Sequence, residues 1–128
     1  MTITPATLTA VAIGGAIGAV TRFYCASMII KHFPHEIPIA TLIINLSGSF
    51  IIGILVALFI HFTPSDILKG FLITGFLGAL TTYSTFAIES YILLNSSFYY
   101  GILNIVSNAL GTVVAAALGF KLIETLIR

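Results

Sequence analysis

Long uncharged stretches are the feature that most constrains this chain. Its 128 residues include only five Lys or Arg and four Asp or Glu, which leaves residues 37–60, 70–88 and 90–120 without a formal charge. A soluble domain carries about 25% charged residues, whereas this chain carries 7% and is 59% hydrophobic. Because a helix needs about 20 apolar residues to cross the hydrocarbon core of a bilayer, these stretches predict membrane-spanning helices.

The number of spans follows from the uncharged stretches and from one turn signal. Residues 95–97 read NSS, which divides the last and longest stretch. We therefore expect an all-helical membrane protein, a single domain over residues 1–128, with four spans at about residues 6–30, 38–61, 67–94 and 98–124. The first span lacks a preceding basic segment and is longer than the apolar part of a signal peptide, so we expect it to be retained.

Several functional classes are disfavoured by the composition. A net charge of +1 without a basic patch argues against nucleic acid as a partner. Cys25 is the single cysteine and has no internal disulfide partner. Residues 31–36 read KHFPHE, and an interfacial loop is favoured over a metal site because the ligand spacing is incomplete. The sequence has no nucleophile–base pair or cofactor motif, so we predict no enzymatic activity.

Positive charges at the ends of the spans are nearly balanced. With four spans, Lys69, Lys121 and Arg128 lie on one side of the membrane, and Lys31 lies on the other with Arg22 near it. Loops rich in Lys and Arg usually face the cytoplasm, so this small difference gives only a weak preference for one orientation. Insertion both ways round, and hence an antiparallel dimer, is a hypothesis that the charges allow.

Polar side chains recur at helical spacing inside the second and fourth spans. They are Thr41 and Asn45 in the second span, followed by Gly48, and Asn104, Ser107, Asn108 and Thr112 in the fourth. Residues four apart lie on one face of a helix. Two interpretations fit this pattern equally: hydrogen bonds between helices, each worth about 0.6 kcal/mol, or a polar path through the membrane.

The third span contains a segment that is poor at forming a continuous helix. Four hydroxyl side chains compete there for backbone hydrogen bonds, and two glycines loosen the turn before them; the residues are Gly75, Gly78, Thr81, Thr82, Ser84 and Thr85. We expect a break at about residues 78–82. Freed carbonyl oxygens in lipid cost several kcal/mol each unless they are buried or bound, and a hard cation prefers oxygen ligands. Two copies meeting on a symmetry axis would complete such a site.

Tyr83 and Phe86 are three residues apart, so their rings are neighbours on one helix face. The edge of an aromatic ring carries positive charge, and rings presented edge-on would stabilise a small desolvated anion. Ordinary packing is the default explanation for two aromatic residues at this spacing, and the pair alone does not indicate a function.

Three segments together resemble the Fluc family of fluoride channels, also called CrcB-type proteins. They are GGAIGAVTR at residues 14–22, IATLIINLSGSFIIG at residues 39–53 and GALTTYSTFAIE at residues 78–89. The resemblance covers the first three helices, whereas the fourth matches only loosely. It implies an antiparallel, dual-topology homodimer with a broken third helix, two pores and a central structural sodium ion. It further implies passive export of fluoride, which lowers cytoplasmic fluoride, across the plasma or inner membrane of a prokaryote.

The resemblance also assigns roles to individual residues. It implies that backbone carbonyls of Gly78 and Thr81 from both subunits hold the sodium ion. Asn45 matches an asparagine that donates hydrogen bonds in the pore, and Phe86 matches the second ring of an aromatic box that begins at Tyr83. The other residues implied along the ion path are Thr41, Ser84, Thr85, Asn108 and Thr112, with Arg22 as a vestibule cation or structural anchor and Glu89 as the acid of the third helix.

Two positions depart from the family pattern. Tyr83 stands where the family usually has phenylalanine, and Ala87 replaces a common serine. The tyrosine keeps the charge distribution of the ring and adds a hydroxyl that is able to donate to an anion or to a neighbouring polar group. These changes bear on conductance and local geometry rather than on the class of protein.

Two alternatives from other classes of membrane protein are separated by the same residues. A small multidrug exporter also has four helices, but it needs a carboxylate in its first span to exchange protons for a cationic drug. This first span contains Arg22 instead, and Glu89 is the only acid inside a span. A non-transporting accessory subunit would explain close-packing glycines such as Gly14 and Gly18, but not the aligned hydroxyls and asparagines.

Overall fold

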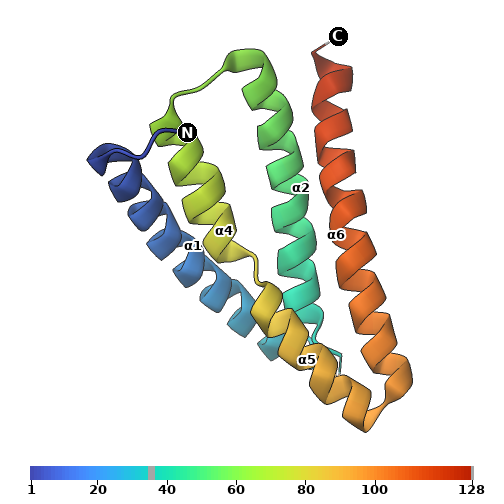
Figure 1. The fold of residues 1–128 in the computed structure, drawn as a ribbon. Helices are drawn as coiled ribbons and strands as arrows, with labels where there is room; N and C mark the ends of the chain where they lie inside the picture. The colour runs from blue at the N-terminus through green and yellow to red at the C-terminus, as the bar shows by residue number, and fades with distance from the viewer. Residues whose placement is uncertain (35–36, 128) are drawn as a thin grey trace.

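The computed structural model describes residues 1–34 and 37–127, and nearly all of them are helical (Figure 1). The elements are α1 (Pro5–His32), α2 (Ile39–Phe62), α3 (Asp66–Lys69), the π-helix η1 (Gly70–Leu77), α4 (Gly78–Leu80), α5 (Tyr83–Ser96) and α6 (Phe98–Leu126). In this described part of the chain, four segments are long and apolar enough to cross a membrane: α1, α2, α3 to α5 together, and α6. The predicted four membrane-spanning helices are confirmed.

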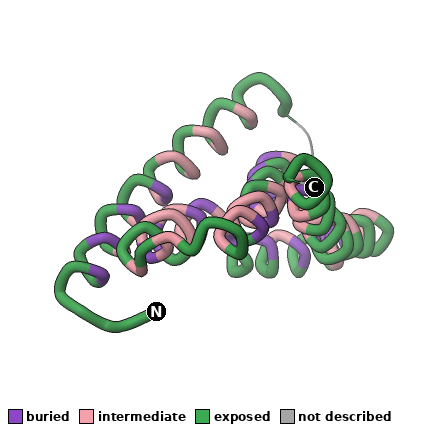
Figure 2. The backbone as a smooth tube through the Cα atoms, turned by 90° about the horizontal axis from the view of Figure 1, so that it is seen from above, coloured by how far each residue is buried: buried purple, intermediate pink, exposed green. Residues whose placement is uncertain are grey.

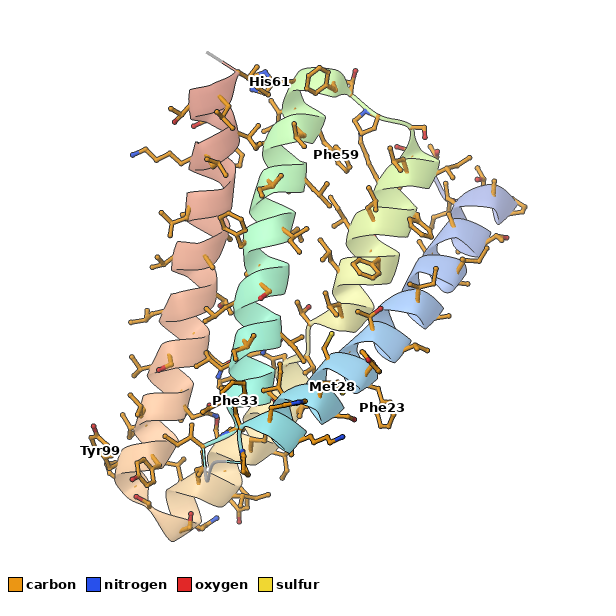
Figure 3. The ribbon with its side chains drawn as sticks, turned by 180° about the vertical axis from the view of Figure 1, so that it is seen from behind. Phe23, Met28, Phe33, Phe59, His61 and Tyr99 are labelled. Atoms are coloured by element: carbon orange, nitrogen blue, oxygen red, sulfur yellow. The ribbon has the colours of Figure 1, made fainter. Side chains whose placement is uncertain are left out.

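Both termini lie at the same end of the molecule. Figure 1 shows the N-terminus, the C-terminus and the connection between α2 and α3 at this end, whereas α5 turns into α6 at the opposite end. Seen from above, the buried residues lie where the helices face one another, and the outer faces are exposed (Figure 2). Phe23, for example, points from α1 away from the other helices (Figure 3). The outer surface is therefore apolar and suited to lipid or to another chain.

Small residues let the helices approach closely in two pairs, α1 with η1 and α2 with α6. A Cβ atom added at Gly14 on α1 would collide with the carbonyl oxygen of Phe71. A Cβ atom added at Gly119 on α6 would collide in the same way with the carbonyl oxygen of Phe50. In lipid, where apolar burial gives helices little reason to associate, such close backbone packing is the main source of helix–helix affinity.

The third span changes helix type twice and then breaks. It begins as α3, widens into η1, in which hydrogen bonds join residues five apart, and narrows again into α4. Thr81 (φ −79°, ψ 154°) and Thr82 (φ −146°, ψ 117°) are both extended, and α5 begins directly after them. The break that the hydroxyl cluster predicts is therefore confirmed. The π-helix is a further feature that the sequence did not predict.

One residue, Ser97, separates α5 from α6. Its backbone is extended (φ −154°, ψ 108°), and its N–H donates to the Leu93 carbonyl at 2.7 Å. A Cβ atom added at Gly101 would lie 2.6 Å from Cγ of Leu94, so a glycine is needed where the two helices turn back on each other. The second half of the third span is thus joined to α6 by a tight turn.

Candidate functional site

The helix break is paired by a side chain from α2. The Thr82 N–H donates to Oδ1 of Asn45 at 2.9 Å, and Nδ2 of Asn45 donates to the Thr82 carbonyl at 3.1 Å. Both residues are buried within the chain. Because an unpaired backbone group at membrane depth costs several kcal/mol, the Asn45 amide supplies the two hydrogen bonds that the interrupted helix gives up at this residue.

Two carbonyl groups lose their helical partners as a result. In a continuous α-helix the N–H of residue 82 pairs with the carbonyl of Gly78, and the N–H of residue 85 pairs with the carbonyl of Thr81. Here the Thr82 N–H donates to Asn45, and the Thr85 N–H donates to Oγ1 of Thr82 at 3.2 Å. Gly78 and Thr81 also line a hollow of about 140 Å³ between α2 and the third span.

Gly48 lets α2 pack closely against the break. A Cβ atom added at Gly48 would collide with Cγ2 of Thr81. The Thr81 hydroxyl meanwhile donates to the Leu77 carbonyl at 2.9 Å, which turns its methyl group toward α2. The residues that were predicted to interrupt the helix are therefore also the residues against which α2 packs.

The two predicted polar stripes meet and continue into a chain of side-chain hydrogen bonds. Nδ2 of Asn45 donates to Oδ1 of Asn108 at 3.1 Å, and Nδ2 of Asn108 donates to Oδ1 of Asn104, also at 3.1 Å. Nδ2 of Asn104 donates to Oγ of Ser90 at 2.9 Å, and that hydroxyl donates to the Phe86 carbonyl at 2.8 Å. We call Asn45, Asn108, Asn104 and Ser90 the amide relay.

The amide relay is closed off from the surface of the chain. The exposed fractions of Asn45, Asn108, Asn104 and Ser90 are 7%, 3%, 1% and 4%. Ser90 was not singled out from the sequence, and Asn104 was recognised only as a member of a stripe. The available signal was the spacing of Ser90 four residues after Phe86, which places its hydroxyl over the Phe86 carbonyl.

The rings of Tyr83 and Phe86 in the third span contact each other. Their centroids are 5.3 Å apart at an interplanar angle of 64°, which is an edge-to-face arrangement. Phe86 is 8% exposed, whereas Tyr83 is 80% exposed. Ser84 and Thr85 are exposed beside Tyr83, and the Thr82 hydroxyl donates to Oγ1 of Thr85 at 3.0 Å. One ring is thus part of the core and the other faces outward with the hydroxyls.

Thr41 and Glu89 form a second polar pair on the same side. The Thr41 hydroxyl donates to Oε1 of Glu89 at 2.8 Å. Within the described residues, Oε2 of Glu89 is buried and has no hydrogen-bond partner. Both residues, together with Thr85, line a cleft of about 690 Å³ among the end of α1, the start of α2 and α5. The cleft therefore joins the acid of the third span to the hydroxyl-bearing face of α5.

Two predicted site residues lie apart from these contacts. The Thr112 hydroxyl donates to the Asn108 carbonyl of its own helix at 2.7 Å. Arg22 is half-buried on α1, and its side chain makes no hydrogen bond or ion pair with residues 1–34 or 37–127. In the segment at residues 31–36, His35 and Glu36 lie outside the described residues, and the rest of the described chain contains no group of three metal-ligating side chains.

These features define a multi-pass membrane protein with a hydrogen-bonded helix break between α2, α5 and α6. A family model described as "CrcB-like protein, Camphor Resistance (CrcB)" matches residues 9–120. The chain belongs to this family, and the resemblance drawn from the three sequence segments is confirmed.

Curated relatives cover nearly the whole chain. The fluoride-specific ion channel FluC of Sulfurimonas denitrificans is 50% identical over 95% of this chain and 96% of its own length. The proteins of the same name from Campylobacter jejuni and Nautilia profundicola are 44% and 39% identical, over 89% and 95% of this chain and 94% and 97% of their own lengths. These relatives are ion channels by name and not enzymes, which is the class predicted from the sequence.

Proposed function

We propose that this chain is a passive, fluoride-selective channel that exports fluoride and lowers its cytoplasmic concentration. Relatives that match almost all of the chain are named fluoride-specific ion channels. The observation that carries the proposal is the paired helix break beside Phe86, because a polar site kept intact inside an apolar protein indicates a path for a polar solute.

The proposed path replaces the water around the anion with weak donors. An unpaired anion in an apolar medium costs tens of kcal/mol by idealised solvation arguments, and several weak sites in series let an ion enter and leave. The outward-facing hydroxyls of Tyr83, Ser84 and Thr85 and the ring edge of Phe86 are suited to this task. The remaining residues that we assign to the path or its support are Arg22, Thr41, Asn45, Glu89, Asn108 and Thr112.

The proposed working unit is an antiparallel homodimer with two pores. The hydroxyl-bearing face of α5 is exposed in a single chain, and lipid offers its hydroxyls no hydrogen-bond partners. A second copy that covers this face would turn it into an enclosed path, and the nearly balanced Lys and Arg are consistent with insertion in both orientations. Two equivalent faces in such a dimer give two paths.

The break also fits the proposed structural sodium ion. The carbonyl groups of Gly78 and Thr81 lose their helical donors to Asn45 and to the Thr82 hydroxyl, and the two residues line the same hollow. A hard cation bound by these carbonyls of both copies would compensate for the lost hydrogen bonds. When bound, the ion would supply positive charge beside the break. Gly78 and Thr81 would supply the carbonyls, and Asn45 would keep the Thr82 N–H occupied.

Fluoride release from liposomes tests the proposed function. Purified protein in vesicles loaded with potassium fluoride should release fluoride without a proton gradient, and the same vesicles loaded with chloride should release almost none. Fluoride release no faster than from protein-free vesicles would contradict the proposal, and proton movement driven by a cationic drug would favour an exporter.

A variant of Phe86 tests its place beside the path. Phe86→Ile should lower the rate of fluoride release by about tenfold or more, whereas Phe62→Ile, at the exposed end of α2, should not.

A further inference from the structure

The amide relay has a single direction, and its amide donors are almost fully used. Both hydrogens of Nδ2 in Asn45 have acceptors, the Thr82 carbonyl and Oδ1 of Asn108. Both hydrogens of Nδ2 in Asn108 also have acceptors, the carbonyl and Oδ1 of Asn104 at 3.2 and 3.1 Å. Because the Thr82 N–H requires an acceptor, Oδ1 of Asn45 must face it, and every later amide is then oriented by the one before it.

Both ends of the relay lie on the backbone of the third span. It begins on the N–H and carbonyl of Thr82 in the break, passes through α2 and α6, and ends on the carbonyl of Phe86 one turn into α5. Two points four residues apart in the same chain are therefore joined a second time through two other helices. A buried hydrogen-bonded network of this kind, in which each side chain has a partner, favours one arrangement of the groups that it connects.

We propose that the amide relay sets the position of Phe86 relative to the helix break, and that Asn104 and Ser90 are positioning residues of the ion path. This inference rests on the proposed channel function. Asn104 and Ser90 are buried, and their side chains are engaged with each other and with the Phe86 carbonyl. They act by holding the backbone of α5 at the point where the ring of Phe86 meets Tyr83.

A matched pair of serines separates the relay from an ordinary helix hydroxyl. Ser90 and Ser27 each donate to the carbonyl four residues earlier at 2.8 Å. Only Ser90 also accepts a hydrogen bond from another helix, from Asn104, whereas Ser27 is exposed on α1. The change Ser27→Ala therefore removes the same local bond as Ser90→Ala without touching the relay.

The fluoride current through single channels in planar bilayers tests the inference. A loss of folded protein lowers the number of channels but leaves the current of each one unchanged, so this readout isolates positioning. We expect Ser90→Ala to lower the single-channel current by about 2- to 10-fold, the effect of weakening one buried hydrogen-bonded link, and Ser27→Ala to leave it unchanged. A wild-type current in Ser90→Ala would overturn the inference.

Further variants keep the test decisive. Ser90→Cys is nearly isosteric and weakens both bonds without leaving a cavity, so it gives the same test if the alanine variant does not fold, with a wild-type current again overturning the inference. The single-channel current of the double variant Asn104→Leu with Ser90→Ala should be within about twofold of that of Asn104→Leu alone, because both changes interrupt the same hydrogen-bonded chain. Additive losses of current would overturn the inference. Absence of fluoride current in the unmodified protein would instead contradict the proposed function.

Discussion

At the scale of single residues, Asn45 does the work of a peptide group. Its amide presents one acceptor and two donors, and it uses them on the N–H and carbonyl of Thr82 and on Asn108. Both bonds to Thr82 form only while the Thr82 backbone is extended, so the role of Asn45 depends on the helix break. A hydroxyl or a carboxylate cannot replace it, because neither offers an acceptor and two donors in the same plane.

We expect Asn45→Asp to lower fluoride release by about tenfold or more and to destabilise the protein by about 1–3 kcal/mol, because the Thr82 carbonyl and Asn108 lose their donor. Liposome release and thermal unfolding in detergent measure the two effects. Asn95→Asp is the matched control, since the Asn95 amide is exposed and donates to the Tyr91 carbonyl of its own helix at 3.0 Å. Equal losses in both variants would show that Asn45 has no special role.

At the scale of helices, the break was predictable and its pairing was not. Clustered hydroxyls compete for backbone hydrogen bonds within their own turn, so the effect at Thr81 and Thr82 is local and visible in the sequence. Periodicity places Asn45 and Asn108 on faces of their helices, but it does not say which faces meet. Ser90 was missed because an isolated serine in a span ordinarily bonds its own helix, as this one also does.

The π-helix was unpredictable for a related reason. No hydropathy pattern distinguishes eight residues of π-helix from α-helix, and in this chain η1 lies against the glycine-lined face of α1. Gly75 within η1 shows how close this packing is, because a Cβ atom there would lie 2.6 Å from the Val11 carbonyl oxygen. The widened helix and the close approach are properties of the pair of helices rather than of either sequence segment.

Two neighbouring glycines on α1 test this packing. We expect Gly14→Ala to lower the free energy of unfolding by about 1–3 kcal/mol, because its new methyl group collides with the Phe71 carbonyl and the backbone cannot move aside freely. Gly15→Ala should be neutral or slightly stabilising, since the nearest atom to its new Cβ is the Gly75 carbonyl oxygen at 3.9 Å. Thermal unfolding and the monodisperse fraction on gel filtration compare the two, and equal stability would contradict the packing described.

At the scale of the whole molecule, the exposed polar face of α5 and the nearly balanced charges are the two features on which the proposed antiparallel dimer rests. The hydroxyls of Ser84 and Thr85 are unsuited to lipid, and nothing in the described residues covers them. The termini and the α2–α3 connection share one end, so an inverted copy would present these features on both sides of the membrane (Figure 1).

Thiol labelling tests the inverted arrangement. In a Cys25→Ala background, we expect Ser65→Cys and Ser96→Cys, exposed at opposite ends of the molecule, each to react to about one half with a membrane-impermeant reagent added outside sealed cells. Detergent, which opens the cells, should raise the labelled fraction at both positions to completion. Full labelling at one position and none at the other would show a single orientation and remove the antiparallel dimer.

The turn at Ser97 has a consequence for how the chain enters a bilayer during synthesis. With 14 residues, α5 is about 21 Å long, so it crosses a hydrocarbon layer of about 30 Å only together with the part of the third span that precedes the break. On α6, the buried amide of Asn104 donates to Ser90 of α5, directly across this turn. The last two spans should therefore leave the insertion machinery as a preassembled hairpin rather than one after the other.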